Sequence, residues 1–359
     1  MTPEPGSYHD LVLGSSPSSF MTLFQAQWRE HINSFPARYQ TGKQIVHGSR
    51  LRPLLVAWGY LLADADFADD RRADIARLAV YVELLHKATI LIDDLIDEDS
   101  ARNGEESFHV QFSDSETILF AIYLLGDSLE RLALAAVSID TGKWYREITQ
   151  LLGAAIKEMT SGALEEVINS GDHLVIFAKA KRLIELQTIA LMKNGLLTGY
   201  KYGRGNEQHT ATIESLGYDS GYMFQVLNDL EPFLGGDQNA FHKDAVNFDV
   251  LRSRKNITVA FICNRLSPSD RLRLQSLMQS GDPLLPSILT GWFAKYNVLS
   301  GVLDNLSDVK KNIEANTNFL PLDVQRRHGF CAFVNYVLSV AIGRIGGAYG
   351  EKLSEILIK

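Results

Sequence analysis

Apolar residues recur along most of this chain at steps of three and four, the spacing that puts side chains on one face of an α-helix. The clearest stripe comprises Ile75, Leu78, Val82, Leu85, Ile92 and Ile96. Comparable patterns cover residues 115–136, 144–168, 175–203, 211–233, 255–265, 286–305 and 328–358. Alternating runs of the kind that form strands are scarce. The pattern therefore predicts an all-α fold.

Turn-forming residues separate these helical stretches, as at Asn103-Gly104 and Gly235-Gly236. The first 20 residues are rich in Ser, Pro and Gly, which predicts a flexible N-terminal tail over residues 1–20. Beyond the tail there is no repeat of fixed period and no linker-like composition. We therefore expect a single all-α domain over residues 21–359.

The composition supplies enough apolar material for a large core, with 46% hydrophobic and 22% charged residues. A net charge of −8 argues against a nucleic-acid-binding protein, which needs a basic surface. The two cysteines, Cys263 and Cys331, cannot form a disulfide framework and favour a reducing compartment. The start of the chain lacks the pattern of a signal peptide, and charged residues interrupt the most apolar stretches. We expect a cytoplasmic protein without a transmembrane segment.

The densest chemistry lies where an apolar helix runs into acidic residues, since five of the seven residues from Asp93 to Asp99 are acidic. Asp93 and Asp97 are four residues apart and share a helix face, with Asp94 about 100° to one side. Like charges at this spacing repel one another. Oxygen ligands on one face suit a divalent cation, particularly Mg²⁺ that bridges to a phosphate. The segment therefore favours a metal site, and the alternative is a solvated acidic helix end.

These residues carry a resemblance to a known family. The segment LeuLeuHisLysAlaThrIleLeuIleAspAspLeuIleAsp at 84–97 resembles the first aspartate-rich motif, DDxxD, of the trans-isoprenyl diphosphate synthase (polyprenyl synthase) family. HisGlySerArgLeuArgPro at 47–53 resembles its upstream basic segment, and residues 217–229 resemble the approach to its second aspartate-rich motif. The resemblance spans about residues 42–260. It implies the isoprenoid synthase fold, a large helical bundle around a central cavity with two facing acidic helices, and a homodimer.

The resemblance also implies two or three Mg²⁺ ions between the acidic helices. The matching ligands are Asp93, Asp94, Asp97, Asn228 and Asp229. The second motif departs from the family, because Asn228 replaces its first Asp and Pro232 its last. Gln225 and Asp229 share a helix face, whereas Glu231 lies about 100° from Pro232 on an ideal helix and cannot simply replace the missing acid. The alternative for the Asn-Asp pair is a helix-capping role.

Basic and polar residues match the family's site for the allylic diphosphate, the donor of the prenyl chain. Arg102 holds the place of the arginine after the first motif and joins the three aspartates as an expected catalytic residue. Gln187-Thr188 stands where the family usually has Lys-Thr, so one cation is missing. Arg254 and Lys255 match the basic segment that closes over the phosphates. The resemblance thus implies that the donor site is largely kept.

The second substrate of the family, isopentenyl diphosphate, normally meets four groups. Their places are taken here by Ser49 for a lysine, Arg52 for an arginine, His86 for a histidine or glutamine, and Asn103 for an arginine. Losing two charge-assisted hydrogen bonds weakens binding by about 3–6 kcal/mol. Arg50, next to Ser49, is a partial replacement. We therefore expect an altered isopentenyl diphosphate site.

Chain length in the family is gauged by the bulk of side chains one turn before the first aspartate. Here Ala88 and Thr89 occupy those positions, and Leu85 lies farther along the same helix. Without an aromatic plug, a long prenyl tail can pass, which favours a C15–C20 donor. The alternative is that small residues simply let two helices pack closely.

Three functions remain open from the sequence. The first is a Mg²⁺-dependent prenyltransferase that passes the chain to isopentenyl diphosphate or, given Ser49 and Asn103, to another, unknown acceptor. The second is a terpene cyclase that acts on the allylic diphosphate alone. The third is a regulatory subunit of a prenyl diphosphate synthase, which the retained acid cluster argues against.

Overall fold

The computed structural model describes residues 8–14, 16, 18–65, 67–102, 105–137, 142–168, 177–234 and 256–358. Within them the chain forms helices and one two-stranded antiparallel ribbon. The elements are α1 (Tyr8–Leu13), α2 (Phe20–Asn33), η1 (Ala37–Tyr39), α3 (Lys43–Val46), α4 (Leu51–Leu62), α5 (Asp69–Ile96), β1 (Ala101–Arg102), β2 (Glu105–Glu106), α6 (Phe108–Gln111), α7 (Asp114–Val137), α8 (Gly142–Ile168), α9 (Phe177–Ile184), η2 (Glu185–Ile189), α10 (Ala190–Tyr202), η3 (Glu207–His209), α11 (Thr210–Leu230), η4 (Glu231–Phe233), α13 (Ile257–Arg265), α14 (Pro268–Ser280), α15 (Leu285–Lys295), α16 (Val298–Phe319), α17 (Val324–Ile345) and α18 (Gly347–Leu357). The predicted all-α fold is confirmed.

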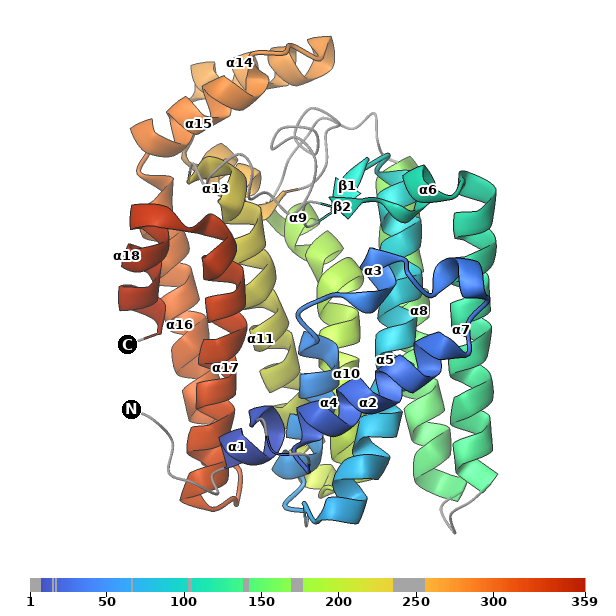
Figure 1. Cartoon of the computed structure of the whole chain (residues 1–359). Helices are drawn as coiled ribbons and strands as arrows, with labels where there is room; N and C mark the ends of the chain where they lie inside the picture. Colours follow the sequence, from blue (N-terminus) through green and yellow to red (C-terminus); the bar gives the residue numbers. More distant parts are fainter. Residues whose placement is uncertain are drawn as a thin grey trace.

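Long helices run side by side as a bundle (Figure 1). α10 packs against α4, α8 and α11. On one side α5 packs against α4 and α7, and on the other α11 packs against α16 and α17. The C-terminal ends of α5, α11 and α17 all lie at the end of the bundle that carries the β1–β2 ribbon, the top in Figure 1. Functional side chains from distant parts of the sequence can therefore meet there.

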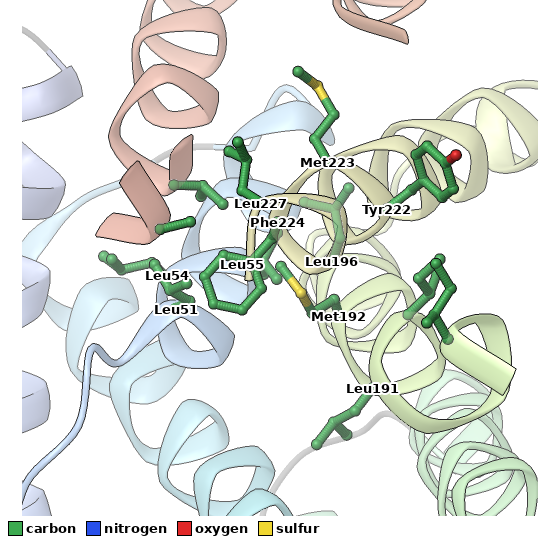
Figure 2. Close-up of a cluster of buried hydrophobic side chains, with 14 of the residues drawn as sticks. Leu51, Leu54, Leu55, Leu191, Met192, Leu196, Tyr222, Met223, Phe224 and Leu227 are labelled. Carbon is green, nitrogen blue, oxygen red and sulfur yellow. The ribbon is translucent and has the colours of Figure 1, made fainter. Parts of the chain in front are cut away.

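The core between α4, α10 and α11 consists of large apolar side chains (Figure 2). Its labelled members are Leu51, Leu54, Leu55, Leu191, Met192, Leu196, Tyr222, Met223, Phe224 and Leu227. Two glycines let α4 and α10 approach closely, because a Cβ on Gly59 would overlap the backbone of Leu196 and one on Gly199 the backbone of Val56. Burying each large apolar side chain stabilises the fold by about 1.5–3 kcal/mol. This packing gives the bundle a rigid centre.

Two stretches that the sequence predicts as single helices are divided. The stretch 286–305 becomes α15 and α16, with Asn297 between them at a φ of 47°. The stretch 328–358 becomes α17 and α18, with Gly346 between them at a φ of 61°. A residue in the left-handed region cannot continue a right-handed helix, and Gly and Asn adopt that conformation most readily.

The predicted N-terminal tail also contains ordered structure. α1 lies within residues 1–20 and packs against α2 and α17. Val12 of this helix is fully buried. Ser19 then caps α2, since its hydroxyl accepts a hydrogen bond from the backbone N–H of Thr22. Residues 8–13 of the stretch predicted as a tail are therefore helical.

Among the described residues, α17 is long and apolar enough to cross a membrane by length and composition. The sequence analysis expected no such segment. The helix packs against α4 and α11, and Phe330, Phe333 and Val337 on it are buried in the core. A core helix of a globular bundle meets the same criterion, so this helix is weak evidence for a membrane span.

Candidate functional site

A cavity of about 890 Å³ lies at the end of the bundle where α5, α11 and α17 finish. Its volume falls within the range of small-molecule sites. Its apolar lining residues include Leu125, Ile156, Met159, Leu183, Ile184 and Phe224. Its polar lining residues include Arg52, Asp93, Asp97, Arg102, Asn228 and Arg344. The cavity can therefore hold a molecule with an apolar chain and a charged head.

The last turn of α5 presents two carboxylates to the cavity, as the sequence predicts. Asp93 and Asp97 both line it, and the Asp93 side chain is 51% exposed. The helix ends at Ile96, and the N–H of Asp97 donates to the Asp93 carbonyl at 2.8 Å. Acidic groups at a helix C-terminus are unfavourable because the helix dipole is negative there. This helix end is therefore a place where cations are strongly attracted.

Asp94 lies in different surroundings from those that the sequence analysis expected for a metal ligand. Its side chain is buried and is not among those that line the cavity. One carboxylate oxygen accepts from Gln44 Nε2 at 2.7 Å, and the other accepts from Arg102 Nε at 2.7 Å. Burial opposes the charge of Arg102, but the attraction of Asp94 and Asp93 raises its pKa. Asp94 therefore positions Arg102 at the cavity wall.

The carboxylates of Asp93 and Asp97 fit a magnesium site. Mg²⁺ prefers oxygen ligands and commonly takes one or two protein carboxylates, with substrate phosphates and water as the remaining ligands. No group of three or more His, Cys, Asp or Glu side chains converges on a metal position within the described residues. A metal here would share its coordination with a phosphorylated ligand instead of being held by the protein alone.

The end of α11 is built differently from the end of α5. Asp229 accepts a hydrogen bond at each oxygen, from Gln225 Nε2 at 2.7 Å and from the backbone N–H of Ile257 at 2.8 Å. Ile257 is the first residue of α13, whose N-cap is Asn256, so Asp229 binds a further free N–H at the start of that helix. Asn228 Oδ1 accepts from Arg344 Nη1 at 3.0 Å. Asn228 and Asp229 line the cavity, but protein donors already occupy both side chains.

Pro232 changes the geometry that an ideal helix would give. α11 stops at Leu230, and η4 forms a single 3₁₀ turn with Pro232 near its start. Proline lacks the N–H that an α-helix would use, and a 3₁₀ turn is tighter than an α-turn. Both Glu231 and Pro232 line the cavity, although a 3₁₀ turn separates consecutive side chains by about 120°, more than the roughly 100° of an ideal α-helix. Glu231 is buried, with 2% of its surface exposed.

Three guanidinium groups converge on the cavity, from Arg52 of α4, Arg102 of β1 and Arg344 of α17. Burial lowers the pKa of Arg52 to about 10; Glu83 opposes this shift, and the charges of Arg344 and Arg102 add to it. Burial also lowers the pKa of Arg344, against the attraction of Glu231. The Nε of Arg52 is buried without a hydrogen-bond partner among the described residues. Mutually repelling cations and an unused donor are features of a site for a multiply charged anion.

The surroundings of Ser49 contain a cation that the sequence analysis did not assign. Lys87 Nζ donates to two backbone carbonyl oxygens at the end of α3, at 2.6 and 2.5 Å. It lies 3.8 Å from Glu83 and 3.1 Å from the position of a Cβ built on Gly48, directly beside Ser49. Burial lowers the pKa of Lys87 to about 7, against the attraction of Glu83. Lys87 is therefore a candidate for the charge that Ser49 lacks.

Arg50, the expected replacement for the lost lysine, is already paired within the protein. Its backbone is left-handed, with a φ of 57°, and its Nη1 donates to Glu83 at 2.5 Å. Its guanidinium also lies over the ring of Trp28, 4.9 Å from the ring centre. Arg50 lines the cavity, but its charge is balanced by Glu83.

His86 lines the cavity together with Arg52, as predicted for the second diphosphate site. Burial, followed by the charges of Arg52 and Lys87, lowers the pKa of His86 well below 6.5. The imidazole is therefore neutral at pH 7. In that form one ring nitrogen can still donate a hydrogen bond to a phosphate oxygen.

A π-helical turn, η2, carries the Gln187-Thr188 pair to the cavity. Gln187 Nε2 donates to Glu166 at 2.8 Å, and Thr188 Oγ1 donates to Gln225 at 2.9 Å. π-turns within α-helices occur frequently at functional sites. Gln187 of η2 is thus bound to α8 through Glu166, and Thr188 of η2 is bound to Gln225 of α11.

Only some of the residues predicted to set the length of the prenyl chain line the cavity. Ala88 and Thr89 line the cavity on α5, as expected. Leu85 is fully buried in the core and is not a lining residue. The predicted substrate contacts Asn103, Arg254 and Lys255 lie outside the described residues.

Sequence reasoning missed two cations of the cavity, Lys87 and Arg344. Arg344 is a single charged residue in an otherwise apolar helical stretch, and such residues are rarely buried without a partner or a function. Glu83, the partner of Lys87, stands one helical turn before it in the sequence, whereas partners from distant segments could not be read from the sequence. Arg344, for example, binds Asn228 from 116 residues away.

Comparisons with known proteins bear on the family and the fold. The family model described as polyprenyl synthetase matches residues 36–284. A short chain isoprenyl diphosphate synthase of Methanothermobacter thermautotrophicus is 26% identical over 274 residues, which cover 74% of this chain and 80% of that protein. The crystal structure of a polyprenyl synthase from Caulobacter crescentus, complexed with calcium and isoprenyl diphosphate, superposes with a TM-score of 0.77 at 18% identity and covers 94% of this chain and 99% of that chain. A geranylgeranyl pyrophosphate synthase from Corynebacterium glutamicum, complexed with isoprenyl diphosphate and magnesium, gives a TM-score of 0.71 at 17% identity over 89% and 96% of the two chains.

Proposed function

Because this chain belongs to the polyprenyl synthetase family, we propose that it ionises an allylic prenyl diphosphate of C15–C20 and transfers the prenyl chain to an acceptor. One observation carries the proposal. Guanidinium groups of Arg52, Arg102 and Arg344 and the half-exposed carboxylate of Asp93 line a cavity that apolar side chains such as Leu125, Ile156 and Leu183 also line. The charged side chains suit a diphosphate and the apolar side chains suit a prenyl chain.

In the proposed reaction, the bond between the first carbon of the donor and the diphosphate oxygen breaks, and its electron pair stays with the diphosphate. Arg102, held in place by Asp94, donates hydrogen bonds to the departing group, and such charge-assisted bonds are about twice as strong as neutral ones. The apolar lining residues keep water from the allylic cation. Electrons of the acceptor then form the new carbon bond, and the acceptor loses a proton.

Asp93 and Asp97 are the residues that we assign to Mg²⁺. When bound, the metal supplies positive charge that stabilises the diphosphate as it leaves. The carboxylates themselves fix the position of this charge at the end of α5, on the same cavity wall as Arg102.

The identity of the acceptor is a more specific proposal than prenyl transfer itself. Ser49, in place of the lysine usual in the family, supports an acceptor other than isopentenyl diphosphate, such as an aromatic or indole ring. Lys87 lines the cavity beside Ser49 and, in its protonated form, supports a second diphosphate at the same place. The two acceptors differ in charge, so their products can be told apart directly.

Product analysis tests the proposal. The protein is incubated with C10, C15 and C20 allylic diphosphates and Mg²⁺, with and without isopentenyl diphosphate or indole. A longer diphosphate identifies chain elongation, and a prenylated indole identifies the other acceptor. A hydrocarbon or alcohol made from the donor alone would instead assign terpene cyclisation. Absence of turnover with every donor would contradict the proposal and favour a regulatory subunit.

We further propose a homodimer located in the cytoplasm. α7 supports the dimer, because it exposes a stripe of apolar side chains that comprises Ile118, Leu119, Ile122, Tyr123, Leu129 and Leu134. A contiguous apolar surface of this kind marks an interaction site. The two cysteines are free thiols, which supports a reducing compartment.

A further inference from the structure

The end of α11 does not fit the metal site that its place opposite α5 implies. Asn228 carries no charge, and both oxygens of Asp229 accept hydrogen bonds from the protein. Burial lowers the pKa of Arg344, and the negative charge of the remaining acid, Glu231, opposes this shift. Each polar side chain that α11 and η4 bring to this wall therefore already has a positive or hydrogen-bond-donating partner.

Arg344 occupies the position where a second-helix metal would be expected. Its Nη1 lies 3.0 Å from Asn228 Oδ1, the oxygen that would have to serve as a ligand. Its guanidinium lies over Phe224, 5.7 Å from the ring centre, so the side chain is held from two sides. Arg102 lies similarly close to Asp93, 3.2 Å from its Oδ2, but the negative charge of Asp93 offsets that guanidinium. The neutral amide of Asn228 does not offset the charge of Arg344, which therefore repels a divalent cation.

We propose that the guanidinium of Arg344 replaces the metal at the second acidic helix and binds the diphosphate on that side of the cavity. The inference rests on the proposed diphosphate-binding function and specifies how it is achieved. A guanidinium offers five N–H donors in a planar fork that matches phosphate oxygens. The bond to Asn228 uses one of these donors and orients the group. Divalent cations are then held at the α5 side alone, by Asp93 and Asp97.

Two measurements on the whole protein test this proposal. Calorimetric titration with inorganic pyrophosphate in Mg²⁺ gives the affinity, and electron paramagnetic resonance counts Mn²⁺ bound per chain in the presence of pyrophosphate. Arg344→Gln is expected to weaken pyrophosphate binding about 10- to 100-fold, the value of one or more charge-assisted hydrogen bonds. Its Mn²⁺ count is expected to equal that of the wild type. Arg327→Gln, on the same helix and outside the cavity lining, is the matched control and should leave both values unchanged.

Variants at Asn228 distinguish whether a guanidinium or a metal ion occupies the position beside this side chain. Asn228→Ala is expected to keep the wild-type Mn²⁺ count, whereas the pair Asn228→Asp with Arg344→Gln is expected to gain one Mn²⁺ because it exchanges the cation for a carboxylate. Arg344→Lys keeps the charge but loses the planar fork, so its pyrophosphate affinity should lie between those of the wild type and Arg344→Gln. If Arg344→Gln loses its helical circular dichroism and is therefore unfolded, Arg344→Lys takes its place in the pyrophosphate titration.

A loss of one Mn²⁺ in Asn228→Ala, or equal pyrophosphate affinity in the wild type and both Arg344 variants, would overturn the proposal. Either result leaves the proposed function standing as long as the wild type binds pyrophosphate with a divalent cation. Failure of the wild type to bind pyrophosphate at all would count against the proposed function itself, and against this inference with it.

Discussion

Asp93 and Asp94 are adjacent in the chain, but their carboxylates lie in different surroundings. Both carboxylates bind Arg102, but the Asp93 side chain is half exposed in the cavity, 3.2 Å from Arg102 Nη2. Asp94, in contrast, is buried against Arg102 and Gln44. The helix period separates neighbours by about 100°, so a motif of consecutive acids cannot place all of them on one face. At the scale of residues, we therefore expect different tasks for the two.

Substitution of each aspartate by alanine should separate these tasks. Asp94→Ala removes one partner of a buried ion pair and is expected to lower the free energy of unfolding by about 3–5 kcal/mol. Asp93→Ala removes an exposed carboxylate, whose ion pairs typically contribute about 0–1 kcal/mol. Urea denaturation monitored by circular dichroism measures both. Equal stability of the two variants would contradict the structural role of Asp94.

Lys87 should make stability depend on pH. In the unfolded chain its pKa is the ordinary 10.5, and in the folded protein burial lowers it to about 7. Between these values the unfolded state binds one more proton, so the free energy of unfolding rises with pH by up to about 1.4 kcal/mol per unit. Below pH 7 both states bind the proton and the contribution is constant.

The matched variant for this prediction is Lys87→Met, which does not titrate. The difference in unfolding free energy between the wild type and Lys87→Met is expected to grow in favour of the wild type as the pH rises from about 7 toward 10. Denaturant titrations at each pH measure it. Parallel pH profiles for the two proteins would show that Lys87 keeps an ordinary pKa in the fold.

At the scale of elements, the sequence predicts α5 because apolar residues recur at steps of three and four from Ile75 to Ile96, which is a local signal. The same period predicts α7, α8 and α10. It fails where a single residue reverses the backbone, as at Asn297 and Gly346, since one left-handed residue leaves the apolar spacing almost unchanged. It fails again at Arg344, because the partner of this side chain lies on α11 and only the folded bundle brings the two together.

α5 also carries the position that we expect to set the length of the donor. Ala88 is small and lines the cavity, so Ala88→Phe fills space that a prenyl chain would use. Overpacking of this kind costs about 1–3 kcal/mol, which should shift the preference from C20 and C15 toward C10 donors. The ratio of kcat/KM for the three donors measures the shift.

Leu85→Phe is the control for this experiment, because Leu85 is on the same helix but in the core and not at the cavity wall. It should lower stability without changing the order of donors. If Ala88→Phe kept the wild-type order, Ala88 would be a packing residue and not a gauge of chain length.

At the scale of the whole molecule, the exposed apolar stripe of α7 is expected to be covered by a second copy of the chain. Leu119 is 67% exposed and Ile122 is 58% exposed. Placing a charge in the centre of the stripe with Ile122→Glu should convert the dimer to a monomer, since an unpaired charge is costly in an apolar interface. Size-exclusion chromatography with light scattering measures the mass.

Leu272→Glu, at a 69% exposed position on α14, is the control and should leave the mass unchanged. A wild-type protein that is monomeric at all concentrations would contradict the proposed dimer. It would leave the cavity and its chemistry unaffected, because all the residues assigned to the site come from one chain.

The most direct test of the central claim is the release of pyrophosphate from a C15 or C20 allylic diphosphate, compared between the wild type and Asp93→Asn. Release by the wild type is expected to require Mg²⁺. In Asp93→Asn it should fall by about 10²- to 10³-fold, the scale of losing one group that stabilises charge in the transition state, while the variant keeps its helical circular dichroism. Wild-type rates in Asp93→Asn, or no release by the wild type with either donor, would contradict the account.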